Sequence, residues 1–283
     1  MNILKNEYEK DDLLKILLHS LKLKNIGFTL DDKKASINFF TRVDGVFKVN
    51  NAKVIKINTF CVFSLIVIHN NSETKAGTSV AKIIGLPLKI NKKYFDAILE
   101  IFGSSFFDII PFSNYKVALI IVGDKFFKNG KKENFSEVIE KKIAKFNNSN
   151  IVYKEISSED TDKTQTSIGR AASCSDVLFV GLDASDNRAV ISELVEKLKL
   201  NIPSVSLPLY PGSDTMLFYV SDKPLIILSE DIFSYKITAL DVILPRIFTG
   251  EKLNLEEILK FSVGGLCHLC SICVYPFCSL GKF

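Results

Sequence analysis

The first part of the chain combines one helical apolar period with several short extended runs. Leucines recur at spacings of three and four between residues 11 and 24, which predicts a helix there. Residues 25–60 hold short apolar–polar alternations that predict small strands joined by polar turns, and the β-branched run 60–68 predicts a buried strand. With a further helix expected at 91–102, residues 1–110 are expected to form an N-terminal α+β region.

From residue 115 the pattern changes to almost wholly apolar runs that alternate with amphipathic segments. Short uninterrupted apolar runs are typical of strands that are buried on both faces of a parallel sheet. Strands are expected at 115–122, 151–156, 176–181 and 224–228, and helices at 134–146, 160–173, 186–200 and 231–248. This alternation predicts an α/β domain over residues 111–252, with a mostly parallel sheet in a three-layer α-β-α arrangement.

Polar loops follow the expected strands, at the edge where parallel α/β sheets bind their ligands. Glycine in such a loop allows a ligand to approach the backbone closely, and a helix start can hold a phosphate. We therefore expect a binding site that contains Gly123, Asp124, Gly181, Ser185 and Asp186. The alternatives are a plain turn at the first loop and a helix N-cap made by Ser185 or Asp186 at the other.

The segment 253–283 is expected to contain a short helix and then a cysteine-rich tail. Four of the six cysteines fall in one short stretch, at Cys267, Cys270, Cys273 and Cys278. Four thiolates are the ligand set of a structural Zn²⁺ ion or of a [4Fe–4S] cluster, so a metal centre is expected here. His268 is a further available ligand. The alternatives are redox-active thiols, a metal that only staples a short tail, and a tail that binds nothing.

Composition argues against partners such as nucleic acid and membranes. The net charge is only +4 over 283 residues, and basic residues are interleaved with acidic ones. The longest apolar run is too short to span a bilayer, and the first ten residues are polar, so a cytoplasmic protein with reduced thiols is expected. Cys61, in an expected strand, and Cys174, at an expected helix end, are interpreted as buried and inert.

The tail continues from Cys278 into Ser279-Leu280-Gly281-Lys282, and further distinctive segments lie at 75–81, 116–124, 209–212 and 244–252. Together these segments resemble the molybdopterin-binding domain of the molybdenum-insertion enzymes and gephyrin. The resemblance is strongest to a group from anaerobic bacteria that joins this domain to a tail of the form C-x-x-C-x-x-C-x-x-x-x-C-S-x-G-K. It covers residues 50–283, and the tail is its most specific part.

Two of the three binding loops depart from the family pattern. Leu182 stands where the family has a second glycine, and the family's serine is displaced to Ser185. The turn before the last helix of the domain, L-P-G in the family, reads Leu228-Ser229-Glu230-Asp231 here. An added side chain would obstruct a ligand at the backbone, and the two carboxylates would repel its phosphate.

The resemblance implies a protein of molybdenum cofactor biosynthesis or insertion that binds molybdopterin, an anionic pterin phosphate. The altered loops favour binding over catalysis, and any surviving chemistry would use Asp124 or Asp186 to position a metal ion or the transferred molybdate. The resemblance also implies a homo-oligomer. The alternative is a non-catalytic zinc or iron–sulfur scaffold or redox protein that accompanies a molybdenum enzyme. A third class, a nucleotide-binding enzyme of another doubly wound type, lacks a Walker A or G-x-G-x-x-G sequence.

Overall fold

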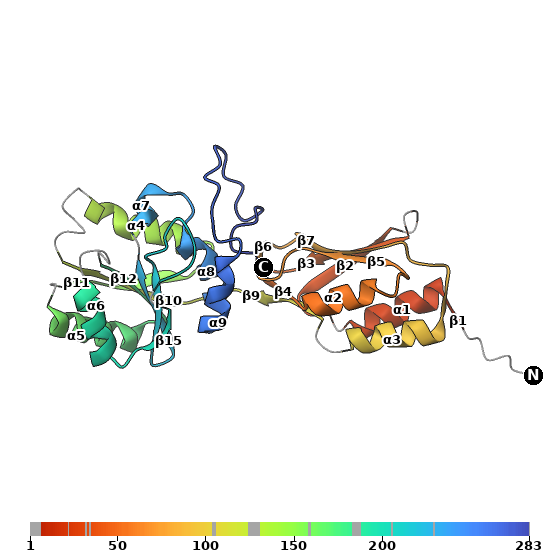
Figure 1. Cartoon of the computed structure of the whole chain (residues 1–283), viewed down its shortest axis with the longest axis horizontal. Coiled ribbons are helices and arrows are strands. Elements are labelled where there is room, and N and C mark those ends of the chain that lie inside the picture. The colour runs from red at the N-terminus through yellow and green to blue at the C-terminus, as the bar shows by residue number, and fades with distance from the viewer. Residues whose placement is uncertain are drawn as a thin grey trace, which may run out of the picture. The chain divides into compact units, whose positions relative to one another are not determined.

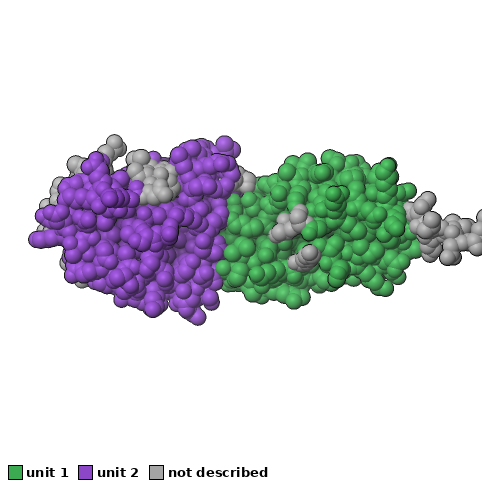
Figure 2. All heavy atoms as spheres, turned by 90° about the horizontal axis from the view of Figure 1, so that it is seen from below, with its two compact units in different colours: residues 1–111 green, residues 112–283 purple. Residues whose placement is uncertain are grey.

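The structure, a computed structural model, divides the chain into two compact units, Met1–Pro111 and Phe112–Phe283 (Figure 1 and Figure 2). It describes residues 7–282 apart from 22, 32, 34, 104–105, 124–130, 158–159, 183–187, 205 and 229, and of residues 131–134, 188–190 and 201–204 it describes the backbone alone. No helix in this described part of the chain is both long and apolar enough to cross a membrane.

Unit 1 packs its helices against small antiparallel sheets around a core of leucine, isoleucine and phenylalanine side chains. The helices are α1 (Lys10–Ser20), α2 (Asn51–Asn58) and α3 (Lys92–Phe102). One sheet has the order β2 (Ile26–Asp31), β3 (Ser36–Thr41), β7 (Ser79–Ile84) and β5 (Ser64–Val67). A second has the order β6 (Ser72–Thr74), β4 (Gly45–Val49) and β9 (Phe107–Pro111), and β1 (Glu7–Glu9) pairs with β8 (Lys89–Asn91). The expected N-terminal α+β region is confirmed.

Two details of the sequence prediction for unit 1 are wrong. Residues 51–58 form helix α2 and not a strand, because the Asn50 side chain caps the helix by accepting from the Lys53 amide at 3.0 Å. The strand expected at 60–68 is reduced to β5. Asn58 closes the preceding turn, since its side chain donates to the Leu65 carbonyl at 2.9 Å and accepts from the Leu65 amide at 2.8 Å.

Unit 2 is built on a six-stranded sheet that is parallel over four neighbouring strands. The order is β11 (Asn150–Ser157), β10 (Lys116–Val122), β12 (Val177–Gly181), β15 (Lys223–Leu228), β14 (Met216–Val220) and β13 (Asn201–Ser204). The first four strands run parallel, whereas β14 is antiparallel to β15 and β13 is antiparallel to β14. The expected mostly parallel sheet is therefore confirmed, while the antiparallel strands at its far edge were not predicted.

Helices cover both faces of this sheet (Figure 1). On one face, Ala118 and Ile120 of β10 pack with Ile168 of α5 (Thr161–Cys174) and Leu194 of α6 (Arg188–Lys197). The other face is covered by α4 (Lys131–Ile143), α7 (Asp231–Ser234) and α8 (Ala239–Ile247). The three-layer arrangement is confirmed.

The helix expected at 231–248 is two helices. A capping box begins α8, in which the Asp241 carboxylate accepts from the Thr238 amide at 2.8 Å and fixes a new helix start. The helix expected at 134–146 begins earlier, at Lys131, and the one expected at 186–200 is shorter. After α8 come α9 (Leu255–Leu259) and a 3-10 turn, Lys260–Ser262, which lead into the cysteine tail.

Candidate functional site

The carboxyl ends of the four parallel strands of unit 2 meet at one edge of the sheet. Val122 is in register with Ser157 of β11, and Gly181 is in register with Ile121 on one side and Leu228 on the other. Four strand exits therefore lie next to each other. This exit edge, the ends of β10, β11, β12 and β15, is the first candidate site.

Two of the five residues expected to bind a ligand fall in the described part of this edge. Gly123 has a φ of +80°, a backbone conformation that side chains disfavour, and its amide donates to the Ser157 carbonyl at 3.0 Å. Gly181 ends β12 and is buried. Asp124, Ser185 and Asp186 lie outside the described residues, so their place at the edge stays a prediction.

The departures from the family pattern have different structural outcomes. The Leu182 side chain is fully buried and packs with the apolar cluster that includes Ile191 and Leu194, so its bulk is turned into the core. The Asp231 carboxylate accepts from the Gly212 amide at 2.6 Å, and this hydrogen bond holds the charge towards the 210–212 turn. Glu230 is exposed. Ser229 lies outside the described residues.

A polar cluster beside the end of β11 was not predicted. Glu155 accepts hydrogen bonds from the Tyr153 hydroxyl, from Ser167 Oγ at 2.9 Å and from Arg170 at 2.5 Å. Glu155, Ser167 and Arg170 border a shallow depression of about 410 Å³ together with Lys163. The hydrogen bond from Tyr153, with those from the other donors, holds the pKa of Glu155 below its usual range. The cluster joins β11 to α5, and only the alternation of β11 could have indicated that Tyr153 and Glu155 share a face.

The lowered pKa of Glu155 gives a testable pH dependence. A carboxyl group whose pKa is lower in the folded than in the unfolded state stabilises the fold at any pH above its unfolded-state pKa. This contribution is lost as the pH falls through the folded-state pKa. We expect an NMR titration of the Glu155 carboxyl to have its midpoint below the ordinary 4.5, and the Tyr153→Phe variant to move that midpoint upwards. An unchanged midpoint in the variant would contradict the assigned cause.

The cysteine tail, residues 264–281, is a loop whose two ends are joined. The Gly281 amide donates to the Gly264 carbonyl at 2.9 Å. Tyr210 of the preceding turn pairs with the tail, since its amide donates to the Gly265 carbonyl at 2.8 Å and its carbonyl accepts from the Cys267 amide at 2.9 Å. The tail is thus held by backbone hydrogen bonds to a turn that lies far away in the sequence.

Side chains fix the rest of the tail to α8. The Tyr275 hydroxyl donates to the Asp241 carbonyl at 2.9 Å, and the Leu280 side chain is buried. Asp241 is itself anchored, because its carboxylate accepts from Lys142 of α4 at 2.7 and 2.9 Å with both side chains nearly buried. The tail therefore rests on a residue of α8 that is itself held by a nearly buried ion pair to α4.

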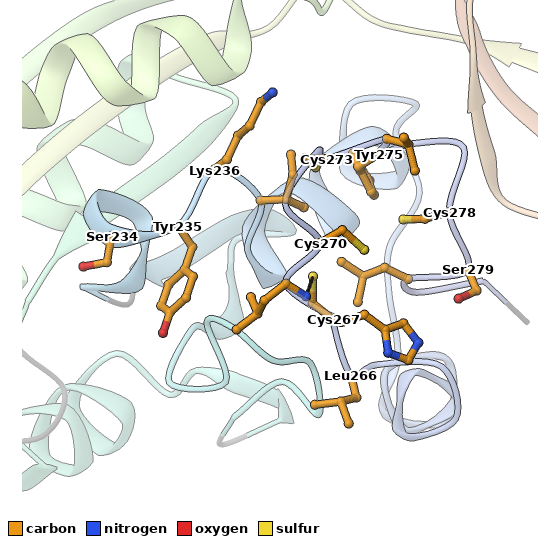
Figure 3. Close-up of a pocket in the computed structure, with 15 residues that line it drawn as sticks. Ser234, Tyr235, Lys236, Leu266, Cys267, Cys270, Cys273, Tyr275, Cys278 and Ser279 are labelled. Carbon is orange, nitrogen blue, oxygen red and sulfur yellow. Dashed lines mark hydrogen bonds between the residues drawn. The ribbon is translucent and has the colours of Figure 1, made fainter.

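All four tail cysteines line one cavity of about 280 Å³, which we call the thiol cavity (Figure 3). The sulfur atoms of Cys267, Cys270 and Cys278 are turned towards the space between the arms of the tail. The wall opposite the tail is the segment between α7 and α8, which includes Tyr235 and Lys236. The structure thus brings together residues that the sequence singled out only by their spacing.

The thiols do not converge on a single point. Among the described residues, which include all six cysteines, no group of three or more His, Cys, Asp or Glu side chains is placed to hold one metal ion. The expected metal centre stays a prediction. Cys61 and Cys174 are both exposed, so their interpretation as buried thiols is wrong, and Cys61 lies in a turn with a φ of +53° and not in a strand.

Neither a protein-family model nor a curated protein matches this chain. Similar solved structures include a molybdopterin biosynthesis MoeA protein from Pyrococcus horikoshii, with 13% identity, a TM-score of 0.30 and coverage of 76% of this chain and 73% of that one. A molybdopterin biosynthesis enzyme MoaB from Thermus thermophilus has 14% identity and a TM-score of 0.35, with coverage of 48% and 98%. The protein CinA, of unknown function, from Thermoplasma acidophilum has 14% identity and a TM-score of 0.31, with coverage of 40% and 87%.

TM-scores of this size are too low to establish a common fold. The architecture of unit 2 is established by its own strand order and helix layers, to which these likenesses add nothing.

Proposed function

We propose that unit 2 binds an anionic pterin phosphate of the molybdopterin type at the exit edge of its sheet, and that the protein acts in molybdenum cofactor biosynthesis or insertion in the cytoplasm. The observation that carries the proposal is the alignment of four parallel strand exits, with glycine at the ends of two of them. This is the edge at which doubly wound sheets bind ligands. The sequence resemblance of residues 116–124 and of the tail supports the pterin as the ligand.

The chemistry of the edge suits binding more than catalysis. Gly123 and Gly181 present no side chain to a ligand, and main-chain amides at strand and helix ends attract a phosphate. Asp124, Ser185 and Asp186 are proposed as the remaining contacts on sequence alone. The Asp231 carboxylate is engaged by the Gly212 amide, so it opposes an anion at the edge less than the sequence suggested.

A pterin-binding titration of Gly123→Val tests the site. The added side chain both strains a backbone with positive φ and occupies the space of the ligand, so we expect the affinity to fall about tenfold or more. The matched control is Gly85→Val in unit 1, where the φ is +77° and the space around the position is open. The fluorescence of copurified pterin after oxidation is an independent measurement that identifies the bound ligand.

Two results would contradict the proposal. The first is a protein that takes up no pterin even when it is incubated with excess cofactor. The second is an equal affinity of Gly123→Val and the wild type, which would place the ligand elsewhere.

A metal centre on the tail is the second candidate function. Its support is that Cys267, Cys270, Cys273 and Cys278 all line the thiol cavity, and four thiolates are the ligand set of a Zn²⁺ ion or a [4Fe–4S] cluster. In this reading the sheet is a scaffold, and the tail binds metal while the protein docks to a molybdenum enzyme. The two functions use different parts of unit 2 and can be tested separately.

A further inference from the structure

We infer that the tail holds a [4Fe–4S] cluster and not a single zinc ion. The inference rests on the metal-binding function proposed for the tail, and it concerns the cavity that the four thiols border. Cys267, Cys270, Cys273 and Cys278 border a cavity of about 280 Å³. The size of this cavity and the spread of the thiols around it separate the two metals.

A tetrahedral zinc site has no internal space. Each sulfur lies about 2.3 Å from the ion, which brings the four sulfurs to within about 4 Å of one another. Such a site gathers its cysteines around one point, and the described cysteines of this chain are not gathered in that way. A single ion would leave most of the thiol cavity empty.

A cubane cluster places its ligands differently. Its four irons sit at separate corners, each binds one cysteine thiolate, and four sulfides fill the other corners. The thiolates therefore surround an eight-atom core from several sides. Figure 3 shows this kind of distribution, because Cys278 approaches from the returning arm of the tail and Cys270 from the outgoing arm.

The walls of the thiol cavity suit a thiolate-bound cluster. Apolar side chains make up much of the lining, among them Leu266, Val274 and Leu280. No carboxylate is among the described residues that line the cavity. Four thiolates around a [4Fe–4S] core leave a net negative charge, which a carboxylate in the lining would oppose.

The cavity is built by the protein's own contacts. The Gly264–Gly281 hydrogen bond, the pairing with Tyr210 and the Tyr275–Asp241 hydrogen bond hold the tail around the space. A metal is therefore not needed as a staple to close the tail. A preformed space of this size is what a pre-shaped site for a polynuclear group requires.

Anaerobic reconstitution of the full chain with ferrous iron and sulfide, after zinc has been removed with a chelator, tests the inference. We expect about four irons and four sulfides per chain, with the broad visible absorption of an iron–sulfur cluster. Serine variants of each tail cysteine are expected to lose that absorption and most of the iron. Cys61→Ser and Cys174→Ser are matched controls, because both thiols are free and lie outside the cavity, and both variants should retain the cluster.

The outcomes separate the inference from the function on which it rests. If the chain binds one Zn²⁺ through the tail and forms no sulfide-bridged iron centre, the cluster is overturned while the metal centre stands. If the chain binds neither zinc nor iron, both the cluster and the metal-binding function of the tail are overturned. A cluster that survives in the tail variants would overturn the assignment of its ligands. Circular dichroism of every variant verifies that the fold is retained.

Discussion

Replacement of Arg246 by alanine is expected to lower the free energy of unfolding of unit 2 by about 3–5 kcal/mol, the usual cost of breaking a buried ion pair from one side. The Arg246 side chain is only 2% exposed. Its guanidinium donates to Glu251 Oε2 at 2.9 Å and to Glu257 Oε2 at 2.6 Å. Its removal takes this cation from two partly buried carboxylates, of which Glu257 keeps the pair with the exposed Lys260, and opens a space at a buried position.

Hydrogen exchange at increasing denaturant, read from peptides of β10 and β12, measures the unfolding of unit 2 separately from that of unit 1. The control is Lys252→Ala, which removes an ion pair with Asp222 in which the two side chains are 51% and 87% exposed. Exposed pairs of this kind contribute at most about 1 kcal/mol. Equal effects of the two variants would mean that the Arg246 network contributes no more than a surface contact.

Replacement of Gly265 by alanine is expected to detach the tail at its base. A Cβ at this position would lie 2.3 Å from the carbonyl oxygens of both Phe261 and Pro208, and neither backbone can move away without cost. The pairing of Gly265 and Cys267 with Tyr210 should then open, at a cost of about 2–3 kcal/mol in local stability. Exchange of the Tyr210 and Cys267 amides reports this opening, and about 30-fold faster exchange is expected.

Gly169→Ala is the matched control for this variant. Gly169 lies inside α5 with no other atom close to the position of an added Cβ, and alanine is the better helix former by up to about 1 kcal/mol. This variant should be as stable as the wild type or slightly more stable. Unchanged exchange at Tyr210 and Cys267 in Gly265→Ala would show that the tail is not held at that point.

The sequence predicted those elements whose apolar period is unambiguous. β12, and β10 after its first residue Lys116, are apolar because both faces of the sheet are covered, and α1 and α3 keep a clear helical stripe. α2 escaped prediction because its β-branched residues favour a strand locally, while the Asn50 cap and the packing of Ile57 decide for a helix. The break before α8 had a signal, the Thr238-x-x-Asp241 capping box, which the sequence analysis overlooked.

The candidate sites were predictable to a different degree. The spacing of the tail cysteines indicated a common role, but their arrangement around a cavity depends on Tyr210, whose pairing with Cys267 no local pattern reveals. The direction of the Leu182 side chain could not be predicted from the sequence either. A leucine after a strand can point towards solvent or into the core, and packing against α6 decides between them.

The hydrogen bond between Gly264 and Gly281 has a consequence for how the tail can work. A segment that is fixed at both ends cannot swing out to deliver its cargo, as the arm of a carrier protein does. Any group bound there must exchange with its source or recipient in place, and a partner has to come to the surface of unit 2. The tail is thus arranged to receive a partner at a fixed position and not to carry a bound group from one place to another.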